Sequence, residues 1–236
     1  MAAWRSTQLN DDRDVFIYLP AAYEQAPCAS LPSIYFHDGN ESLTRTPFHF
    51  KADEHFKTNG NDSAVLVFVA LPSQNQRLAE YTFSTGTAPR GDAYLNALKT
   101  ELVPQISAKF RVCGAADDRG LSGASLGGLI SARGAFNHPE TFGYIGSQSG
   151  SYFWNNAELV TRAGATPVVA VRWYIDHGCP DDNCMSNRDL VTALNGRGYS
   201  VVHNEEALGQ HDWAYWQKRL PQLFSTFRAG RTGCGP

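Results

Sequence analysis

Runs of β-branched and aromatic residues alternate with helical patterns along the whole of this 236-residue chain. The run at 64–70, AVLVFVA, has no polar face, which is typical of a strand that is covered on both sides of a sheet. Further strands are expected at 13–18, 33–36, 119–122, 142–147, 168–175 and 199–203. Strands that alternate with helices build parallel sheets, so the predicted fold class is α/β, with a mostly parallel central sheet and helices on both faces.

Helices are expected where apolar residues recur at helical spacing. These ranges are 95–106 (bent at Pro104), 126–136, 188–195 and a final helix from Asp212. Two stretches, 40–60 and 73–91, read as irregular, and both follow strands. They should therefore lie at the carboxyl edge of the sheet, where open α/β folds bind ligands.

Composition excludes several classes of protein. With 20 Lys and Arg against 23 Asp and Glu, the net charge is −3, which argues against nucleic acid or an anionic membrane as the main partner. No stretch of about 18 apolar residues occurs, so no membrane span is expected. The first residues lack the apolar stretch of a signal peptide. No repeat or linker interrupts the chain, which predicts a single domain over 1–236.

The five cysteines include one closely spaced pair. Cys179 and Cys184 lie in a loop rich in Pro, Asp and Asn, and in an exported protein they are expected to form a local disulfide. In a reducing cytosol they would be inert thiols. The alternative, a zinc site, is a poor match because CxxxxC has no second pair. An odd number of cysteines leaves at least one thiol without an intramolecular partner.

The sharpest motif is the pentapeptide Gly123-Ala124-Ser125-Leu126-Gly127, of the form GxSxG. It follows a predicted strand and begins a predicted helix, which is the setting of a serine nucleophile on a strained turn. The simpler interpretation is an ordinary glycine-rich turn.

A serine nucleophile requires a base. Among the seven histidines, His211 lies after the last strand and before the last helix, hence on the same edge as Ser125. His37, also at a strand end, is better explained as a structural residue of its loop.

An imidazole base requires a carboxylate that fixes its tautomer. Asp176, Asp181 and Asp182 follow the sixth strand, between the serine and the histidine in chain order. Asp181 is favoured because it is far enough along the loop to reach His211, and the other two remain alternatives.

The oxyanion of the reaction requires backbone donors, expected from the N–H of Leu126 and from Gly39 and Asn40 in the loop after the second strand. Four aromatic residues could line a pocket or belong to the core: Phe83, Phe153, Trp154 and Trp213.

Several segments, in order, resemble the putative-esterase family of α/β-hydrolases. They are VFIYLPAAYE (15–24), SIYFHDGN (33–40), the helix before the nucleophile strand (94–112), LSGASLGGLISARGAFNHPETFGYIGSQSGSYFW (121–154) and GQHDWAYW (209–216). The 121–154 segment is especially similar to the enterochelin-esterase-like branch. The likeness covers roughly 13–228. Feruloyl and acetylxylan esterases, S-formylglutathione hydrolases and mycolyltransferases belong to the same family.

The resemblance implies an α/β-hydrolase fold and a serine carboxylesterase. By position it assigns Ser125 as nucleophile, His211 as base and, through the segment 178–181, Asp181 as acid. Cys179-Pro180 and the additional Asp182 depart from the family pattern in this loop. The implied substrate is a small-molecule ester with a bulky or aromatic acyl group, of the siderophore or feruloyl type. No metal or organic cofactor is implied. The size of the chain favours secretion or the periplasm slightly over the cytoplasm.

Two other functions are compatible with the same residues. In an acyltransferase, an alcohol rather than water would intercept the acyl-enzyme. A noncatalytic binding protein would keep the fold and lose the reaction. The sequence does not predict an oligomeric state.

Overall fold

A seven-stranded sheet in the order β3-β5-β4-β6-β7-β8-β9 organises this computed structural model, which describes residues 4–85 and 88–234. The strands are β3 (Val15–Tyr18), β4 (Ser33–Phe36), β5 (Val65–Val69), β6 (Arg119–Ala124), β7 (Tyr144–Gln148), β8 (Arg172–Cys179) and β9 (Val201–Ala207). β3 pairs antiparallel with β5, and every other neighbouring pair is parallel. The predicted mostly parallel sheet is confirmed.

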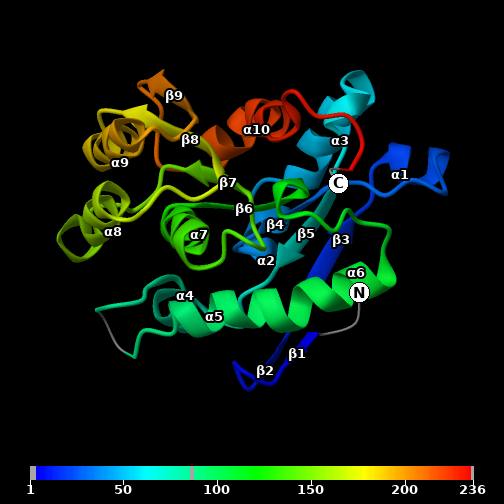
Figure 1. Cartoon of the computed structure of the whole chain (residues 1–236), viewed down its shortest axis with the longest axis horizontal. Helices are drawn as coiled ribbons and strands as arrows, with labels where there is room; N and C mark the ends of the chain where they lie inside the picture. The colour runs from blue at the N-terminus through cyan, green and yellow to red at the C-terminus, as the bar shows by residue number, and fades with distance from the viewer. Residues whose placement is uncertain (1–3, 86–87, 235–236) are drawn as a thin grey trace.

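Alternate residues of the central strands enter two separate cores. Val65, Val67 and Val69 of β5 face one core, while Leu66 and Phe68 face the other. Helices α5 to α9 contribute to the first core, and α3 and α10 contribute to the second, on the opposite face of the sheet (Figure 1). Because both faces are covered, the strands read as continuous apolar runs in the sequence.

Helices cover both faces of this sheet. They are α1 (Ala21–Gln25), α2 (Gly39–Thr44), α3 (Phe48–Thr58), α4 (Gln74–Tyr81), α5 (Gly91–Ala97), α6 (Val103–Lys109), α7 (Leu126–Asn137), α8 (Trp154–Ala165), α9 (Cys184–Arg197) and α10 (Trp213–Arg228). A π-helical turn at Leu98–Leu102 joins α5 to α6. Pro104 lies in the first turn of α6, directly after this π-helical turn.

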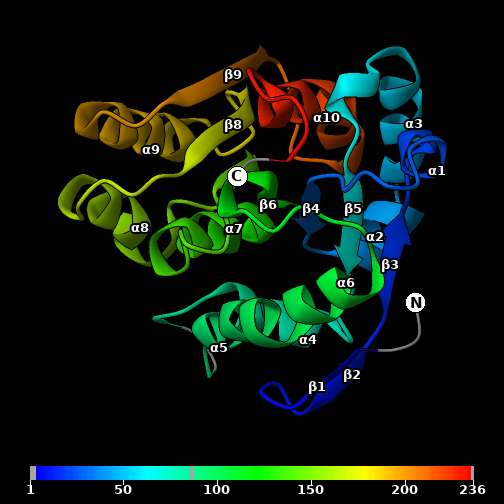
Figure 2. The same ribbon diagram turned by 45° about the vertical axis from the view of Figure 1, so that its right-hand side comes forward.

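The expectation of irregular structure in two stretches is wrong. Residues 40–60 contain most of α2 and all of α3, and residues 73–91 contain α4. Buried Phe48, Ala52 and Phe56 hold α3 against the second core, so a tertiary contact stabilises a helix of weak sequence pattern. A short hairpin of β1 (Trp4–Ser6) and β2 (Asp11–Arg13) was also not expected, and it projects from the main sheet beside α5 and α6 (Figure 2).

The sixth strand lies further along the chain than its pattern predicts. The expected range was 168–175, whereas β8 begins at Arg172 and ends at Cys179. Val168 is 52% exposed and lies outside the sheet, since pairing with β7 begins only where Tyr144 meets Arg172. The shift places Asp176 inside the strand rather than at its end.

Two disulfides cross-link the described residues. Cys179 pairs with Cys184, as expected, and Cys113 pairs with Cys234, which the sequence pattern did not indicate. Cys28 is a free, exposed thiol.

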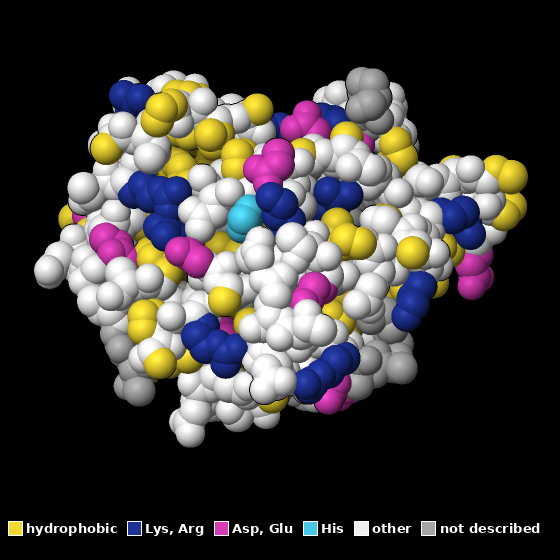
Figure 3. Space-filling model, turned by 60° about the horizontal axis from the view of Figure 1, so that its bottom comes forward, with side chains coloured by type: hydrophobic (Ala, Val, Ile, Leu, Met, Phe, Trp, Pro, Cys, Tyr) yellow, Lys and Arg dark blue, Asp and Glu magenta, His cyan; other side chains and the backbone are white. Residues whose placement is uncertain are grey.

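The surface shows no preference for one sign of charge on the face drawn in Figure 3. Lysine and arginine side chains are scattered there among acidic and apolar ones. Within the described residues, every helix is too short or too polar to cross a lipid bilayer.

Candidate active site

Ser125 lies in the sharp turn between β6 and α7. Its backbone angles, φ 58° and ψ −120°, are in a region that costs a non-glycine residue roughly 1–3 kcal/mol. Three backbone hydrogen bonds stabilise this conformation. The N–H of Ser125 donates to the carbonyl of Gln148 at 2.9 Å, and its carbonyl accepts from the N–H groups of Leu129 at 3.1 Å and Ser151 at 3.0 Å. The expected strand–turn–helix setting of the pentapeptide is therefore present.

Glycine is required at the start of the pentapeptide because its two ends pack together. A Cβ on Gly123 would lie 2.8 Å from the carbonyl carbon of Gly127, which is closer than real Cβ contacts allow. Any side chain at position 123 would push the first turn of α7 away from β6 and would move Ser125 with it.

His211 and Asp182 form a hydrogen-bonded pair. Nδ1 of His211 lies 2.7 Å from Oδ1 of Asp182, whose side chain is fully buried. The other carboxylate oxygen, Oδ2, accepts from the hydroxyl of Ser149 at 2.7 Å and from the N–H of Gly178 at 2.6 Å. Burial alone would raise the pKa of Asp182, but these hydrogen bonds, with that from His211, outweigh it and hold the pKa below its usual value. Asp182 is therefore a charged partner for the imidazole at neutral pH.

Two packing contacts bring His211 to this position. A Cβ on Gly178, near the end of β8, would lie only 2.1 Å from the carbonyl oxygen of Gly209, so the loop before α10 approaches β8 as closely as two glycines permit. The ring of Trp216 packs edge-on against His211 at 5.0 Å, and its Nε1 donates to Ser149 at 2.9 Å. The imidazole is thus held between β8 and the first turns of α10.

The segment from Gln148 to Ser151 connects Ser125 to the His211–Asp182 pair. Gln148 and Ser151 bond the backbone of Ser125, and Ser149 bonds Asp182. The hydroxyl of Ser125 lies 3.2 Å from that of Ser151. Among the described residues no hydrogen bond joins Ser125 to His211. The structure thus brings His211 and Asp182 into contact and places Ser125 on the same edge of the sheet.

The prediction that Asp181 orients His211 is wrong in this structure. Asp181 is exposed, and the neighbouring Asp182, which was an alternative, holds the histidine. Asp176, the other alternative, is buried within β8 and pairs with Arg219 at 3.1 Å. Asp182 lies inside the small ring that the Cys179–Cys184 disulfide closes, and its side chain points inward to Ser149 and to the backbone N–H of Gly178.

Ser149 and Arg219 were not identified from the sequence, although both contact Asp182. Arg219 Nη2 lies 3.4 Å from Oδ2 of Asp182, and its side chain is almost fully buried. The available signal for Ser149 was the polar, glycine-containing run SQSGS at 147–151, which begins at the end of a buried strand.

The three expected oxyanion donors lie at the starts of two helices. Leu126 is the first residue of α7, and Gly39 and Asn40 are the first two of α2. The N–H groups in the first turn of a helix have no intrahelical acceptor. The side chain of Asn40 is otherwise engaged, because its Oδ1 accepts from the N–H of Leu71 at 3.2 Å. A contribution from Asn40 would therefore come from its backbone.

An arginine joins the loop after β4 to the nucleophile turn. Arg77 binds the carboxylate of Asp38 through two hydrogen bonds, of 2.8 and 2.9 Å, and also donates to the carbonyl of Ala124 at 3.3 Å.

His37 has the structural role expected of it: it is buried, and its Nδ1 lies 2.8 Å from the hydroxyl of Tyr94. Burial lowers the pKa of His37 to about 3, so it remains neutral.

The four candidate pocket aromatics lie in different environments. Phe153 is 57% exposed and lines an open depression of about 510 Å³ together with Met185 and Asn183. Phe83 lies beneath the guanidinium of Arg133 at 4.4 Å. Trp154 packs against the first core, and Trp213 packs against the second, between Phe48 and Trp216.

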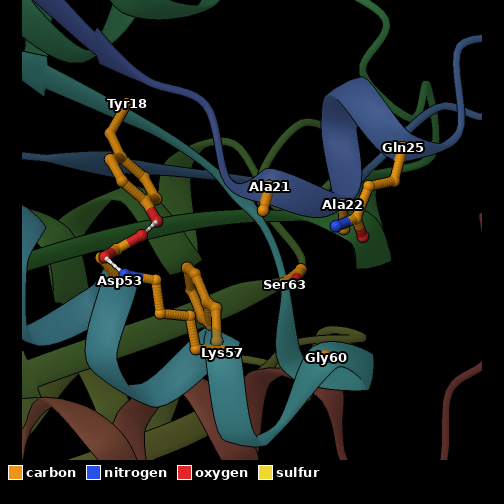
Figure 4. A pocket seen from close by; sticks show the side chains of 9 residues that line it. Tyr18, Ala21, Ala22, Gln25, Asp53, Lys57, Gly60 and Ser63 are labelled. Atoms are coloured by element: carbon orange, nitrogen blue, oxygen red, sulfur yellow. Dashed lines mark hydrogen bonds and ion pairs between the residues drawn. The ribbon is translucent and has the colours of Figure 1, made fainter.

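A smaller cavity of about 210 Å³ lies between β3, α1 and α3 (Figure 4). On its wall the hydroxyl of Tyr18 donates to Asp53 at 3.1 Å, and Lys57 pairs with the same carboxylate at 2.6 Å. These groups already satisfy one another, and the cavity brings no serine next to a histidine. The cavity is therefore not a candidate for the reaction site.

The mostly parallel sheet, with a serine on the turn after β6, an aspartate after β8 and a histidine before α10, defines an α/β-hydrolase fold. The chain belongs to the family described as "Putative esterase", whose sequence profile matches residues 6–227.

Curated relatives and solved structures are consistent with this family. An "Iron(III) enterobactin esterase" of Dickeya dadantii (strain 3937) is 26% identical over 245 residues, which cover 96% of this chain and 54% of that protein. The "Uncharacterized protein YbbA" of Bacillus subtilis (strain 168) is 32% identical over 155 residues, covering 62% of this chain and 60% of that protein. The chain thus spans little more than half the length of these relatives.

Two solved structures share the fold. An enterobactin esterase from Shigella flexneri, crystallised in the presence of enterobactin, superimposes with a TM-score of 0.84 at 23% identity, covering 96% of this chain and 57% of that one. A ferulic acid esterase superimposes with a TM-score of 0.80 at 20% identity, covering 96% of both chains.

Proposed function

We propose that this protein is a serine carboxylesterase in which Ser125, His211 and Asp182 act as the catalytic triad. The observation that carries the proposal is the 2.7 Å hydrogen bond between His211 and the buried Asp182, on the same edge as the strained Ser125. Membership of the esterase family supports an ester as the substrate.

In the proposed acylation step, Ser125 Oγ attacks the carbonyl carbon of the ester. His211 Nε2 takes the hydroxyl proton, because Nδ1–H is donated to Asp182. The tetrahedral intermediate collapses, the bond to the leaving alkoxide breaks, and His211 returns the proton to the departing alcohol. Water then attacks the acyl-enzyme by the same route and releases the carboxylic acid. Before attack, Ser125 must exchange its contact with Ser151 for one with His211.

The negative charge on the carbonyl oxygen requires hydrogen-bond donors. The backbone N–H of Leu126 is the proposed first donor, and the N–H groups of Gly39 and Asn40 are the proposed second source. One donor of this kind typically stabilises the transition state by about 2.7–4 kcal/mol. The Arg77 bridge supports this arrangement, because it holds the loop after β4 at a fixed distance from the nucleophile turn.

A bulky or aromatic acyl group is the proposed substrate class. The depression beside the loop of Asp182 offers two exposed apolar side chains, Phe153 and Met185, which an aromatic ring could cover. Relatives whose names describe enterobactin esterases and a siderophore triacetylfusarinine C esterase support a siderophore-type ester. A feruloyl-type ester has the same aromatic character.

An oxidising compartment, the periplasm or the outside of the cell, is the proposed location. Two disulfides support it, because structural disulfides persist in such compartments and are rare in a reducing cytosol.

Active-site labelling and a substrate panel test the proposal. A fluorophosphonate probe should label the wild-type protein at Ser125 and should not label Ser125→Ala, whose thermal midpoint should stay within a few degrees of wild type. The panel should include a short p-nitrophenyl ester, a feruloyl ester and a catechol trilactone. A folded wild-type protein that resists the probe and hydrolyses none of these esters would refute the proposal. If an added alcohol receives most of the acyl group in place of water, the protein is an acyltransferase.

A further inference from the structure

Three metal-ligating side chains meet at the edge of the sheet, outside the triad. His177 is on β8, and His203 and Glu205 are on the neighbouring β9, where the parallel register places Glu205 opposite His177. The Nε2 atoms of the two histidines are 2.9 Å apart, and Oε2 of Glu205 lies 3.7 Å from His177 Nε2. One ligand atom from each of the three residues thus lies within 4.8 Å of the ligand atoms of the other two.

The histidine tautomer favours a ligand at this point. Nδ1 of His177 lies 2.9 Å from the carbonyl oxygen of Gly178, to which it must donate a proton. Its Nε2 therefore carries a lone pair that points at the Nε2 of His203. A backbone carbonyl on the far nitrogen is the usual support of a metal-bound histidine.

We propose that His177, His203 and Glu205 bind one divalent transition-metal ion of the zinc class. Two imidazole nitrogens and one carboxylate oxygen suit Zn²⁺, Co²⁺ or Ni²⁺ better than Mg²⁺ or Ca²⁺, which take oxygen ligands. Water would complete a four-coordinate site. On binding, the proton on His203 moves from Nε2 to Nδ1 through solvent, so the two facing nitrogens both become acceptors and no net proton is released.

Glu205 remains able to coordinate the ion although Arg188 already binds it. The guanidinium of Arg188 donates to both carboxylate oxygens, at 2.6 and 2.7 Å. Each carboxylate oxygen has a second lone pair, and the Arg188 side chain is 46% exposed and can move aside. The nearby sulfurs of Cys179 and Cys184 are joined to each other and are not free ligands.

The ion would link the edge strand β9 to β8. Because it would bind the folded chain and not the unfolded one, it would raise the thermal midpoint in proportion to the logarithm of its concentration. This role does not depend on the esterase reaction, so binding can be measured whatever the activity proves to be.

Metal titration of tag-free, chelator-treated protein tests the proposal. Competition with a chromogenic chelator should give one Zn²⁺ per chain, and Co²⁺ should give visible absorption bands of a four-coordinate site. His203→Asn, at a partly exposed position, and Glu205→Gln should each weaken Zn²⁺ binding at least about tenfold, and both should lose the Zn²⁺-dependent rise in thermal midpoint.

The matched control is His138→Asn, which removes a histidine that lies 3.6 Å from a different glutamate, Glu140. This variant should bind Zn²⁺ as wild type does. Equal binding by wild type and His203→Asn would overturn the proposal, as would a wild-type stoichiometry far below one. Titration with Ca²⁺ and Mg²⁺ should leave the midpoint unchanged, and a rise with either ion that matches the Zn²⁺ effect would also overturn it.

Discussion

Asp182 receives three close hydrogen bonds in a fully buried position, from His211, Ser149 and the backbone of Gly178. An amide in its place would keep the shape but would lose the charge and would offer a donor where the site requires an acceptor. We expect Asp182→Asn to lower kcat by on the order of 10³–10⁴-fold, as a wrong histidine tautomer does in other triads.

The neighbouring carboxylate provides the control. Asp181 is exposed, and Asp181→Asn should retain kcat within about twofold, since surface substitutions away from special contacts have small effects. Steady-state kinetics on a p-nitrophenyl ester measures both variants. A larger loss in Asp181→Asn than in Asp182→Asn would reject our assignment of the acid.

The pH dependence follows from the lowered pKa of Asp182. Its carboxylate stays charged in the folded protein at any pH above the usual aspartate value of 3.8. The contribution of the lowered pKa to the free energy of unfolding is therefore complete at neutral pH. It is lost only as the pH falls below 3.8. Between pH 5 and 7 the carboxylate should therefore add no ionisation of its own to the activity, so a plot of log kcat/KM against pH should not exceed a slope of one. A slope of two would show that the carboxylate titrates in the same range.

Spacing along the chain limited the candidates for the proposed acid to three aspartates but could not choose among them. Ser125 and His211 could be selected because each adjoins a strand end in a recognisable motif. The orientation of Asp182 depends on a closed loop and on Ser149 and Arg219, which reach it from other elements. No pattern within a single segment encodes such a contact.

The end of β8 and the loop before α10 touch at two glycines. Gly178→Ala would place a methyl group 2.1 Å from the carbonyl oxygen of Gly209, so the loop that carries His211 must move. A displacement of about 1 Å can cost roughly 10²-fold in rate, and we expect a loss of that order in kcat.

Gly196→Ala is the matched control for this variant. Gly196 lies within α9, with open space around its Cβ position, and alanine there should stabilise the helix by about 0.5–1 kcal/mol with unchanged kcat. Thermal melting and steady-state kinetics on both variants separate the two effects. Unchanged kcat in Gly178→Ala would show that this contact does not position His211.

At the scale of elements, the sequence was most informative about the strands of the sheet. Continuous apolar runs identified the central strands, and the ends of most lie within a few residues of prediction. The helices α3 and α4 were missed because they are short and polar on much of their surface, and packing rather than propensity holds them. β8 was misplaced because its true range includes Asp176 and His177, polar residues that are buried in the sheet.

The Cys113–Cys234 disulfide fastens the end of the chain to the amino-terminal side of the sheet. Cys113 lies just before β6, while Ser125 lies at the opposite, carboxyl end of that strand. The bond closes a loop across 121 positions, so its loss should lower the free energy of unfolding by about 2–4 kcal/mol. Activity at 25 °C should change little.

Urea denaturation of the double variant Cys113→Ala/Cys234→Ala measures this effect. Cys28→Ala, which removes the free exposed thiol, is the control and should unfold like wild type. Equal midpoints for the double variant and wild type would show that the bond does not constrain the unfolded chain.

The α/β class and the sheet were predictable for the molecule as a whole, because both follow from the alternation of strands and helices. The single-domain organisation over 1–236 stays a prediction. The long-range disulfide was not predictable, since nothing near Cys113 or Cys234 indicates a partner 121 positions away.

The ring closed by Cys179 and Cys184 holds the loop of Asp182, the proposed acid, through a bond that a thiol reductant can cleave. Glutathione or a thioredoxin that opened this ring would free the loop of Asp182 while the sheet and the serine turn stayed folded. Catalytic rate would then report the redox state of the surroundings. A preparation stored in dithiothreitol would underestimate what the oxidised protein can do.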